Sequence, residues 1–250
     1  MKKVLFILFL SLVSFGFSQS ADELFSQANG LYKDGKYQKS IDLYEKIEGL
    51  GVQSEELYFN LGNSYYKLNM VAPSIYNYER ALKINPINED ALINLEFANR
   101  MAMDAVIPLP KSVFQKFSDA VIYKLPYESW AIISILLSFL GALLFLLYHF
   151  SYTSSKKLLF FNTSILSSIL LILTVFFAFK AFSYEENTLM AIVFEKTAEI
   201  KNGPTLNSDT MFELHEGTKI QVLDGIDDWM KIKLADGKIG WIIAEYIKEI

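Results

Sequence analysis

Side chains able to carry acid–base or metal chemistry are scarce in this 250-residue chain, which has two histidines, His149 and His215, and no cysteine. Without cysteine there is no disulfide, thiolate zinc site or iron–sulfur cluster. The pair Asp227–Asp228 is interpreted as a turn, because two acids fall short of the about six to eight oxygen ligands that calcium requires. The chain contains no GxxxxGK[ST], HExxH or GxSxG sequence. We therefore expect a protein that is not an enzyme and uses no cofactor or metal.

The two histidines have structural interpretations. His215 lies in the turn-like sequence ELHEG, far from any other histidine, so a packing or turn role is favoured over a ligand role. His149 lies at the end of an apolar segment and is expected at a membrane interface. The net charge of −5 argues against nucleic acid as a partner.

Apolar residues make up 52% of the chain and are concentrated in three blocks. The first, VLFILFLSLVSFGF after Lys2 and Lys3, predicts a signal peptide over residues 1–20, with an uncleaved anchor helix as the alternative. The second and third run without charge from Trp130 to Phe150 and from Leu158 to Phe179. Each is long enough to cross the hydrocarbon layer. Buried helices of a soluble core are the alternative that this length disfavours.

The connector between the second and third blocks is too short to form a domain. We therefore expect a helical hairpin, with transmembrane helices over residues 129–151 and 158–180 and a cytoplasmic loop over 152–157. Lys156 and Lys157 in this loop favour its cytoplasmic placement. Both flanking parts would then lie in the periplasm, at the bacterial inner membrane, which agrees with the export signal.

Residues 21–100 contain an internal repeat whose copies are offset by about 34 residues, the period of the tetratricopeptide repeat (TPR). The segment LFSQANGLYKDGKYQKSIDLYEKI, from Leu24, aligns with YFNLGNSYYKLNMVAPSIYNYERA, from Tyr58, and LINLEFANR from Leu92 continues the series. The repeat resembles the TPR family, and the resemblance implies stacked helix pairs. The third copy supplies only a first helix and is expected to act as a cap.

Three pairs of residues at equivalent repeat positions have clear packing or turn roles: Ala28 and Gly62, Tyr44 and Tyr78, Gly35 and Asn69. The first pair lets two helices approach closely, and the second fills the space between neighbouring units. The third suits a left-handed turn residue between paired helices.

The resemblance to TPR proteins implies a scaffold that binds a peptide or partner in a concave groove lined by the first helix of each unit. The polar residues expected on that face are Asn29, Lys33, Asn60, Asn63, Lys67 and Asn94. Asparagine amides can pair with a peptide backbone, and lysines can meet a carboxylate. The alternative is that these are ordinary exposed helix residues.

Residues 101–128 are predicted to be a linker followed by an amphipathic segment. Pro108 and Pro110 should end a helix and stiffen an extended piece. The sequence KSVFQKFSDAVIYKL places Val113, Phe114 and Phe117 near one helical face. Such a helix suits a bilayer surface, and packing against protein remains the alternative.

The pattern changes to short strands in residues 189–250. The segments KIQVL (219–223), WMKIKL (229–234) and IGWII (239–243) are rich in β-branched residues, and Asp236–Gly237 is a hairpin signal. The residues that carry a resemblance to bacterial SH3-like domains are Leu214, Glu216–Gly217, Trp229, Gly237, Gly240–Trp241 and Tyr246–Ile247. The resemblance implies a small all-β barrel, in a family with wall-binding, peptide-binding and purely structural members.

Trp229 and Trp241 are candidates for an aromatic ligand surface, because indole rings stack on sugars and on proline-rich strands. Trp241 lies inside an apolar strand and is expected to fill the barrel core. For Trp229, a core position and a ligand surface are equally compatible with the sequence.

The expected fold class is a multidomain membrane protein with an all-α TPR solenoid, a transmembrane helical hairpin and a small all-β SH3-like barrel. This order, with NLEFANR before a Pro-Leu-Pro linker, resembles the BatE proteins of Bacteroides aerotolerance (Bat) operons. The resemblance implies a partner of von Willebrand A-domain membrane proteins and a MoxR-type AAA+ ATPase in oxygen tolerance or envelope stress. We expect a non-enzymatic periplasmic adaptor, with a peptidoglycan tether that uses the SH3-like domain as the alternative.

Overall fold

The computed structural model describes residues 21–250. The predicted signal peptide, residues 1–20, lies outside the described residues. The chain divides into two compact units. One contains the segments up to Ile84, Asn88–Pro108 and Met190–Ile250, and the other contains Leu109–Leu189 with Asn85–Ile87. Each unit is described by itself.

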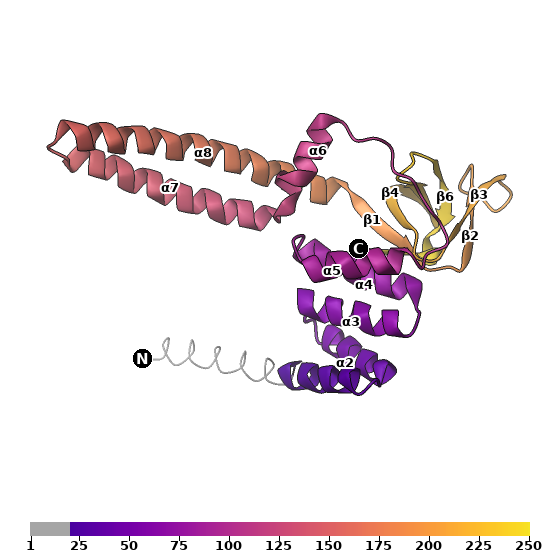
Figure 1. Ribbon diagram of the computed structural model, residues 1–250. Helices are drawn as coiled ribbons and strands as arrows, with labels where there is room; N and C mark the ends of the chain where they lie inside the picture. Colours follow the sequence, from indigo (N-terminus) through magenta and orange to yellow (C-terminus); the bar gives the residue numbers. More distant parts are fainter. Residues whose placement is uncertain (1–20) are drawn as a thin grey trace, which may run out of the picture. The chain divides into compact units, whose positions relative to one another are not determined.

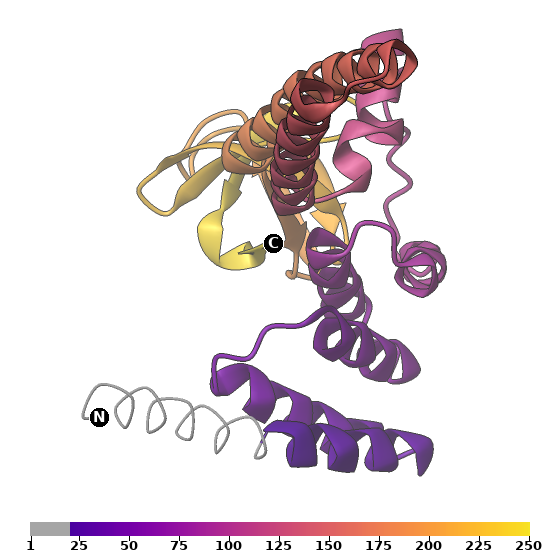
Figure 2. The same cartoon turned by 90° about the vertical axis from the view of Figure 1, so that its left-hand side faces the viewer.

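The first unit begins with a stack of helices, here called the helical stack (residues 21–99; Figures 1 and 2). A helix over residues 21–33 precedes α2 (Tyr37–Gly49), α3 (Glu55–Lys67), α4 (Val71–Ile84) and α5 (Glu89–Asn99). The first two form one pair, α3 and α4 form the next, and α5 stands in the place of the first helix of a third. This agrees with the pairing that the repeat offset predicts.

Serine hydroxyls and small residues join the helices of each pair. Ser40 Oγ donates to the Ala28 carbonyl at 2.9 Å, and Ser74 Oγ donates to the Gly62 carbonyl at 3.1 Å, so the same contact recurs one repeat later. A Cβ atom at Gly62 would come within 2.7 Å of the Tyr78 ring. Gly62 therefore leaves no room for a side chain, because the Tyr78 ring packs directly against it. This agrees with the close approach of two helices that is expected at this position.

The turns inside the helix pairs have the left-handed backbone that was predicted. Gly35 has φ 74° and Asn69 has φ 57°. Two later helix starts are capped by side chains, since Ser54 accepts from the Leu57 amide at 3.1 Å and Asn88 from the Ala91 amide at 2.8 Å.

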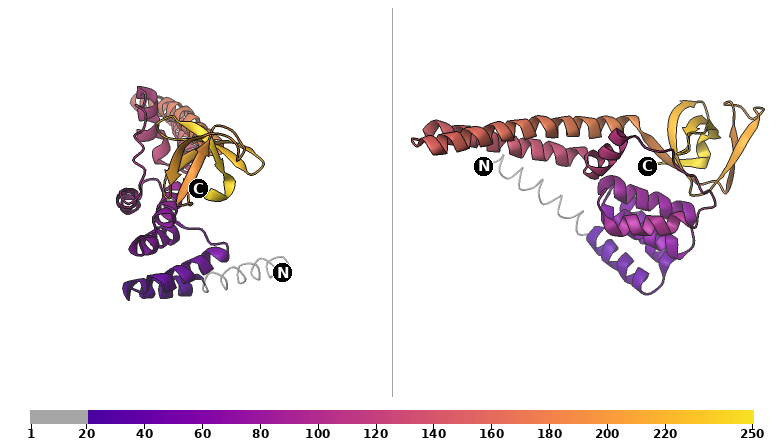
Figure 3. Two further views of the ribbon diagram at one scale, coloured as in Figure 1. Left: turned by 90° about the vertical axis from the view of Figure 1, so that its right-hand side faces the viewer. Right: turned by 45° about the horizontal axis from the view of Figure 1, so that its top comes forward.

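The first unit ends in a set of strands, here called the β module (residues 189–250; Figure 3). Its strands are β1 (Leu189–Val193), β2 (Thr197–Lys201), β3 (Thr210–His215), β4 (Lys219–Ile226), β5 (Trp229–Lys233), β6 (Ile239–Ile243) and β7 (Ile247–Glu249). They form one sheet in the order β3-β2-β6-β5-β4-β1-β7. Gly237 has φ 91° in the turn between β5 and β6, as its Asp-Gly sequence predicts.

The expected barrel is not closed, which corrects the prediction from the sequence. The two edge strands, β3 and β7, do not pair with each other. The last strand has three residues, and these pair with Ala191–Val193 of β1. The sheet still surrounds one apolar core, because all seven strands contribute buried side chains to it, Ile200, Ile232 and Ile242 among them.

The prediction that Trp241 fills this core is wrong. In β6, Gly240 and Ile242 are buried, and strand alternation places Trp241 on the opposite face, where it is half-buried. A Cβ atom at Gly240 would overlap Ile200 Cγ2, so the core face has no room for a side chain at that position. Because the sequence IGWII is apolar on both faces of the strand, the sequence alone does not indicate which face the indole ring occupies.

The helical stack and the β module share a core within the first unit. Ile75, Leu95 and Ala98 of the stack form one buried cluster with Ile192 of β1, and Phe194 packs against it. A Cβ atom at Gly217, whose φ is 90°, would lie 2.9 Å from Val71 Cγ1. The β module therefore packs against the end of the stack at which the third repeat is truncated.

The second unit is dominated by two long helices, α7 (Tyr127–Phe150) and α8 (Ser154–Asn187), which lie side by side (Figures 1 and 3). Both are long and apolar enough to cross a membrane, by length and composition. The turn between them is shorter than the expected loop over 152–157, because Lys156 and Lys157 already belong to the first turn of α8. The second helix also continues past Lys180.

Small polar side chains join α7 and α8, the helices here called the hairpin. Ser134 Oγ lies 2.9 Å from Thr174 Oγ1, and Ser167 Oγ donates to the Leu137 carbonyl at 2.9 Å. These three polar side chains are buried. A Cβ atom at Gly141 would lie 3.5 Å from Ser167 Oγ, an ordinary contact distance.

The amphipathic segment forms α6 (Val113–Ala120), followed by the short helix η1 (Ile122–Lys124). Ser112 caps α6 with a capping box that involves Gln115. This segment lies beside the end of the hairpin at which α7 begins and α8 ends (Figure 1).

Candidate functional site

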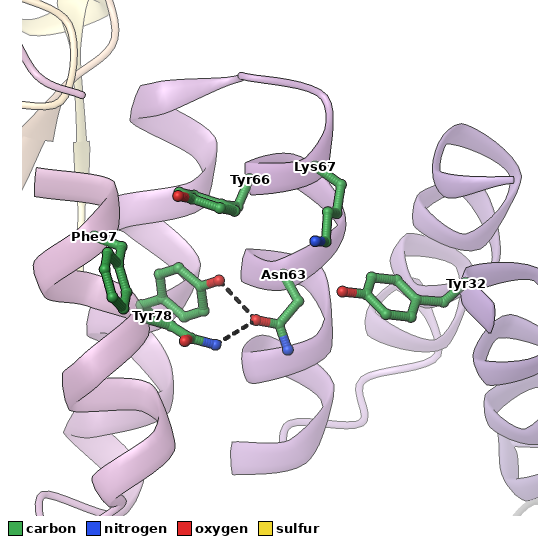
Figure 4. Close-up of a pocket in the computed structure, with 7 residues that line it drawn as sticks. Tyr32, Asn63, Tyr66, Lys67, Tyr78 and Phe97 are labelled. Atoms are coloured by element: carbon green, nitrogen blue, oxygen red, sulfur yellow. Dashed lines mark hydrogen bonds between the residues drawn. The ribbon is translucent and has the colours of Figure 1, made fainter. Parts of the chain in front are cut away.

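The asparagines predicted to line the groove bind each other and the buried tyrosines. Asn29 Oδ1 accepts from Tyr44 Oη at 2.5 Å and from Asn60 Nδ2 at 3.2 Å. One repeat later, Asn63 Oδ1 accepts from Tyr78 Oη at 2.7 Å and from Asn94 Nδ2 at 2.8 Å (Figure 4). The two sets, here called the polar network, therefore link the first helices of all three repeats.

The tyrosines of the polar network are buried, and each donates a hydrogen bond to an asparagine. Tyr44 and Tyr78 are each 1% exposed. Burial raises the pKa of both hydroxyls above the usual value, so they stay protonated at neutral pH. Each protonated hydroxyl can therefore donate to an asparagine oxygen.

Each asparagine pair keeps one donor and one acceptor for a ligand. Asn63 uses its oxygen in the polar network, which leaves its Nδ2 as a donor, and Asn94 uses its nitrogen, which leaves its Oδ1 as an acceptor. A peptide backbone offers the complementary carbonyl and amide at each residue. The second pair, Asn29 and Asn60, offers the same combination one repeat earlier.

A pocket of about 200 Å³, here called the groove pocket, lies beside Asn63 and Asn94. It is lined by Tyr32, Asn63, Tyr66, Lys67, Tyr78, Asn94 and Phe97. In Figure 4, the Lys67 ammonium and the Tyr32 hydroxyl lie on the same side of Asn63. The groove pocket thus combines aromatic walls, one cation and the free amide groups, a set suited to an extended peptide with a carboxylate.

The predicted groove residues divide into three groups. Asn63, Lys67 and Asn94 line the groove pocket, and Asn29 and Asn60 meet in the polar network. Lys33 is exposed and lies outside the lining of the groove pocket. The sequence interpretation missed Tyr32, Tyr66 and Phe97, although Tyr32 and Tyr66 occupy equivalent repeat positions and the offset would have paired them.

A second pocket, of about 220 Å³, lies between the helical stack and the β module. It is lined by Glu45, Glu48, Leu61, Tyr65, Pro73, Tyr76, Asn77, Arg80, Phe194 and Lys248. Arg80 in this lining is already engaged, because it pairs with Glu48 at 2.5 Å and donates to Tyr58 Oη at 2.7 Å. We interpret this pocket as part of the contact between the two modules.

Asp104, just beyond α5, is the main polar contact between the helical stack and the β module. Its Oδ2 accepts from the His215 amide and from Thr218 Oγ1, each at 2.6 Å, and its Oδ1 lies 2.8 Å from His215 Nδ1. Lys219 adds an ion pair with Glu79 at 2.6 Å. His215 therefore has a structural role of the kind expected, with a partner that the sequence did not indicate.

The hydrogen bonds at Asp104 favour its charged form. Burial alone would raise the pKa of this carboxyl, but the bonds from Thr218 and from the His215 amide and ring outweigh it and hold the pKa below its usual value. Asp104 is thus a carboxylate in the folded protein, and the contact depends on that charge.

Trp229 and Trp241 lie on the outer face of the β module. Register pairs place Trp229 opposite Ile243 and Lys231 opposite Trp241 on neighbouring strands. The Lys231 Nζ atom lies 6.0 Å from the Trp241 ring centroid. Trp229 alternates with Met230, which packs on the core, so its ring is directed away from the core. Both indoles thus belong to one outer surface.

Two segments match known families. Residues 55–88, which span α3 and α4, match the tetratricopeptide repeat, and residues 196–248 match the bacterial SH3 domain. No curated protein matches the chain. The chain thus combines two domains of non-catalytic, binding type. Within residues 21–250 no group of three or more histidine or acidic side chains could hold a metal ion.

Proposed function

We propose that this protein is a membrane-anchored adaptor that presents a TPR groove and a bacterial SH3 domain on one side of a membrane. The shared core of the helical stack and the β module carries this proposal. Ile75 and Leu95 precede the hairpin in the chain and Ile192 follows it, yet they pack together. If α7 and α8 both cross the bilayer, the two ends of the hairpin lie on the same side, as this contact requires.

The periplasm is the side that the sequence favours. The predicted signal peptide exports the residues after it, and Lys156 and Lys157 at the turn of the hairpin favour the cytoplasm for that turn. Protease added to intact spheroplasts should therefore cut the helical stack and the β module while a tag inserted at Ser154 survives. Cleavage of that tag alone would contradict this topology.

The groove pocket is the proposed site for a partner peptide. Its free amide groups and aromatic walls fit an extended backbone, and Lys67 fits a carboxylate on that peptide. The order of segments in this chain resembles that of BatE proteins. By this resemblance, the partners would be von Willebrand A-domain membrane proteins and the MoxR-type ATPase system of aerotolerance or envelope stress. A tether close to such proteins raises the effective concentration of both binding domains.

Photocrosslinking in native membranes tests the groove pocket. A benzophenone amino acid at Tyr66 should capture a partner that mass spectrometry identifies, and Lys67→Ala should reduce the yield. Lys33→Ala is the matched control, because this lysine is exposed but outside the pocket lining. Equal yields from all three proteins would contradict the groove assignment.

A peptidoglycan tether is the second candidate, and the outer face of the β module favours it. Trp229 and Trp241 with Lys231 form an aromatic and cationic surface suited to sugars that carry carboxylates. The full chain in detergent should then sediment with purified cell wall. Trp229→Ala with Trp241→Ala should abolish pelleting, whereas Leu206→Ala, at an exposed position of the same domain, should not.

A further inference from the structure

The outward side of α6 is strongly apolar and uncovered. Val113 is 80% exposed, Phe114 is 82% exposed and Phe117 is half-exposed, all within a short stretch of a single helix. Water is a poor solvent for two neighbouring phenylalanine rings, so a contiguous apolar surface of this kind indicates a contact with something else.

The other sides of α6 are already used. Ser118 is buried and accepts a hydrogen bond from Lys180 Nζ of α8 at 2.8 Å. Phe117 lies at the border of the packed and uncovered sides, with its ring 6.4 Å from that of Phe177. On the side away from the phenylalanines, Lys111 pairs with Asp119 at 2.6 Å. The helix therefore has a packed side, a polar side and the apolar side formed by Val113, Phe114 and Phe117.

These contacts hold α6 at one end of the hairpin. Trp130 Nε1 of α7 donates to the Ile122 carbonyl at 2.8 Å, just after α6 ends. The Tyr123 and Tyr184 rings are stacked, with their centroids 4.3 Å apart. In Figure 1, α6 runs across the end of the hairpin rather than along it. Tryptophan and tyrosine rings are typical of the boundary between hydrocarbon and water.

We propose that α6 is an interfacial helix whose apolar side inserts into the lipid surface at the end of the hairpin. This inference rests on the proposed membrane placement of α7 and α8. Lipid is the favoured occupant because ring contacts join the uncovered side of α6 to the exposed apolar surface of the hairpin. The Phe117 ring lies 6.4 Å from that of Phe177, which lies 6.2 Å from the ring of the exposed Phe176. An exposed lysine at position 116 can meet lipid phosphates from the same helix.

Single-cysteine variants test the proposal in the full-length chain, which has no cysteine of its own. Phe114→Cys places a fluorophore on the apolar side of α6, and Asp119→Cys places it on the polar side of the same helix. Phe139→Cys, on the exposed surface of α7, reports on the hairpin. Each protein is reconstituted in vesicles of phosphatidylethanolamine and phosphatidylglycerol. Quenching is measured with iodide in water and with nitroxide-labelled lipids.

For Phe114→Cys we expect quenching by shallow nitroxide lipids, and iodide quenching at least about threefold weaker than for Asp119→Cys, since the apolar side lies within the acyl boundary. Equal iodide quenching of the two α6 variants, with Phe139→Cys quenched by deep nitroxides, would overturn the proposal and leave the membrane hairpin intact. Shielding of Phe114→Cys from both quenchers would overturn it in favour of a protein partner. Iodide quenching of Phe139→Cys would contradict the membrane hairpin and the proposal together.

Discussion

The helical stack and the hairpin both join antiparallel helices through serine hydroxyls that donate to carbonyls of the neighbouring helix, but they differ in what fills the space between the helices. In the stack, Ser74 is accompanied by the fully buried Tyr78 ring. In the hairpin, the buried groups along the contact between α7 and α8 are small and polar: Ser167 and the Ser134–Thr174 pair. The buried Phe177 ring clusters with Ile122 of η1 and Ala181 at the end of the hairpin.

With the hairpin placed in a membrane as proposed, this difference follows from the solvent around each region. In water, burying an aromatic ring is strongly favourable, so a large side chain at the helix contact stabilises the stack. In lipid, an apolar ring gains little by moving from acyl chains to a helix contact. Close packing of small residues and interhelical hydrogen bonds then decide which faces meet. The hairpin contact at Gly141 and Ser167 fits that pattern.

Removing an aromatic ring from the helical stack should lower the free energy of unfolding more than any of the other proposed substitutions. Tyr78→Ala deletes a fully buried aromatic side chain and should lower the free energy of unfolding of the stack by about 3–5 kcal/mol. Thermal unfolding of the full chain in detergent, followed by circular dichroism, measures the change. Tyr78→Phe keeps the ring and loses only the bond to Asn63, so its cost should be about 1 kcal/mol. Similar costs for the two variants would show that the hydroxyl, not the ring, stabilises the contact.

Substitution of Asp104 tests whether contact with the β module stabilises the helical stack. Asp104→Ala removes three hydrogen bonds to a partly buried carboxylate and should cost about 1.5–3 kcal/mol. Because the pKa of Asp104 is lowered in the folded protein, its contribution is fully present above the usual value near 3.8 and is lost as the pH falls through the folded pKa. The difference in unfolding midpoint between wild type and variant should therefore shrink below about pH 4. A difference independent of pH would contradict the role of the charge.

The same substitution can be made in both regions. Gly62→Ala forces a Cβ to within 2.7 Å of the Tyr78 ring, which should cost about 1–2 kcal/mol after the gain in helix propensity. Gly141→Ala meets Ser167 at 3.5 Å and should be neutral or slightly stabilising. Thermal unfolding measures the first change, and unfolding of the reconstituted protein in mixed micelles measures the second. Equal costs would remove the distinction between the two contacts.

Among the substitutions expected to destabilise the protein, the smallest loss of stability is expected inside the hairpin. Thr174→Val removes the Ser134–Thr174 hydrogen bond while preserving the shape of the side chain, and should cost about 0.6 kcal/mol, as such bonds between membrane helices do on average. Titration of the micellar protein with a denaturing detergent provides the measurement, with Thr163→Val, whose hydroxyl bonds within α8, as the control. A cost above that of Gly62→Ala would reverse the comparison.

Much of the helical stack was predictable because the repeat assigns the same role to equivalent positions of successive copies. Once the offset between equivalent positions is known, the roles of Gly62 and Tyr78 follow from those of Ala28 and Tyr44, and the left-handed turn residues follow from the pairing. The asparagine face was predicted from the resemblance to TPR proteins, but the hydrogen bonds among its residues were not. Whether an amide faces solvent or its neighbour depends on side-chain distances that the repeat spacing does not specify.

The contacts that the sequence did not indicate join segments far apart in the chain. Asp104 meets His215 across 111 positions, in a place set by how the β module packs on α5. No local pattern marks such an aspartate. The outward direction of Trp241 was missed for a different reason: its strand is apolar on both faces, so alternation alone did not reveal which face belongs to the core.

The shared core around Ile75, Leu95 and Ile192 makes residues 109–189, the proposed membrane anchor, an insertion within a single folded unit. In the proposed topology, the helices of the stack are synthesised first, and residues 109–189 are inserted into the membrane before β1 is made and covers the end of the stack. The end of α5 then remains uncovered while the hairpin is inserted. The first unit can complete its folding only after insertion of the proposed anchor is finished.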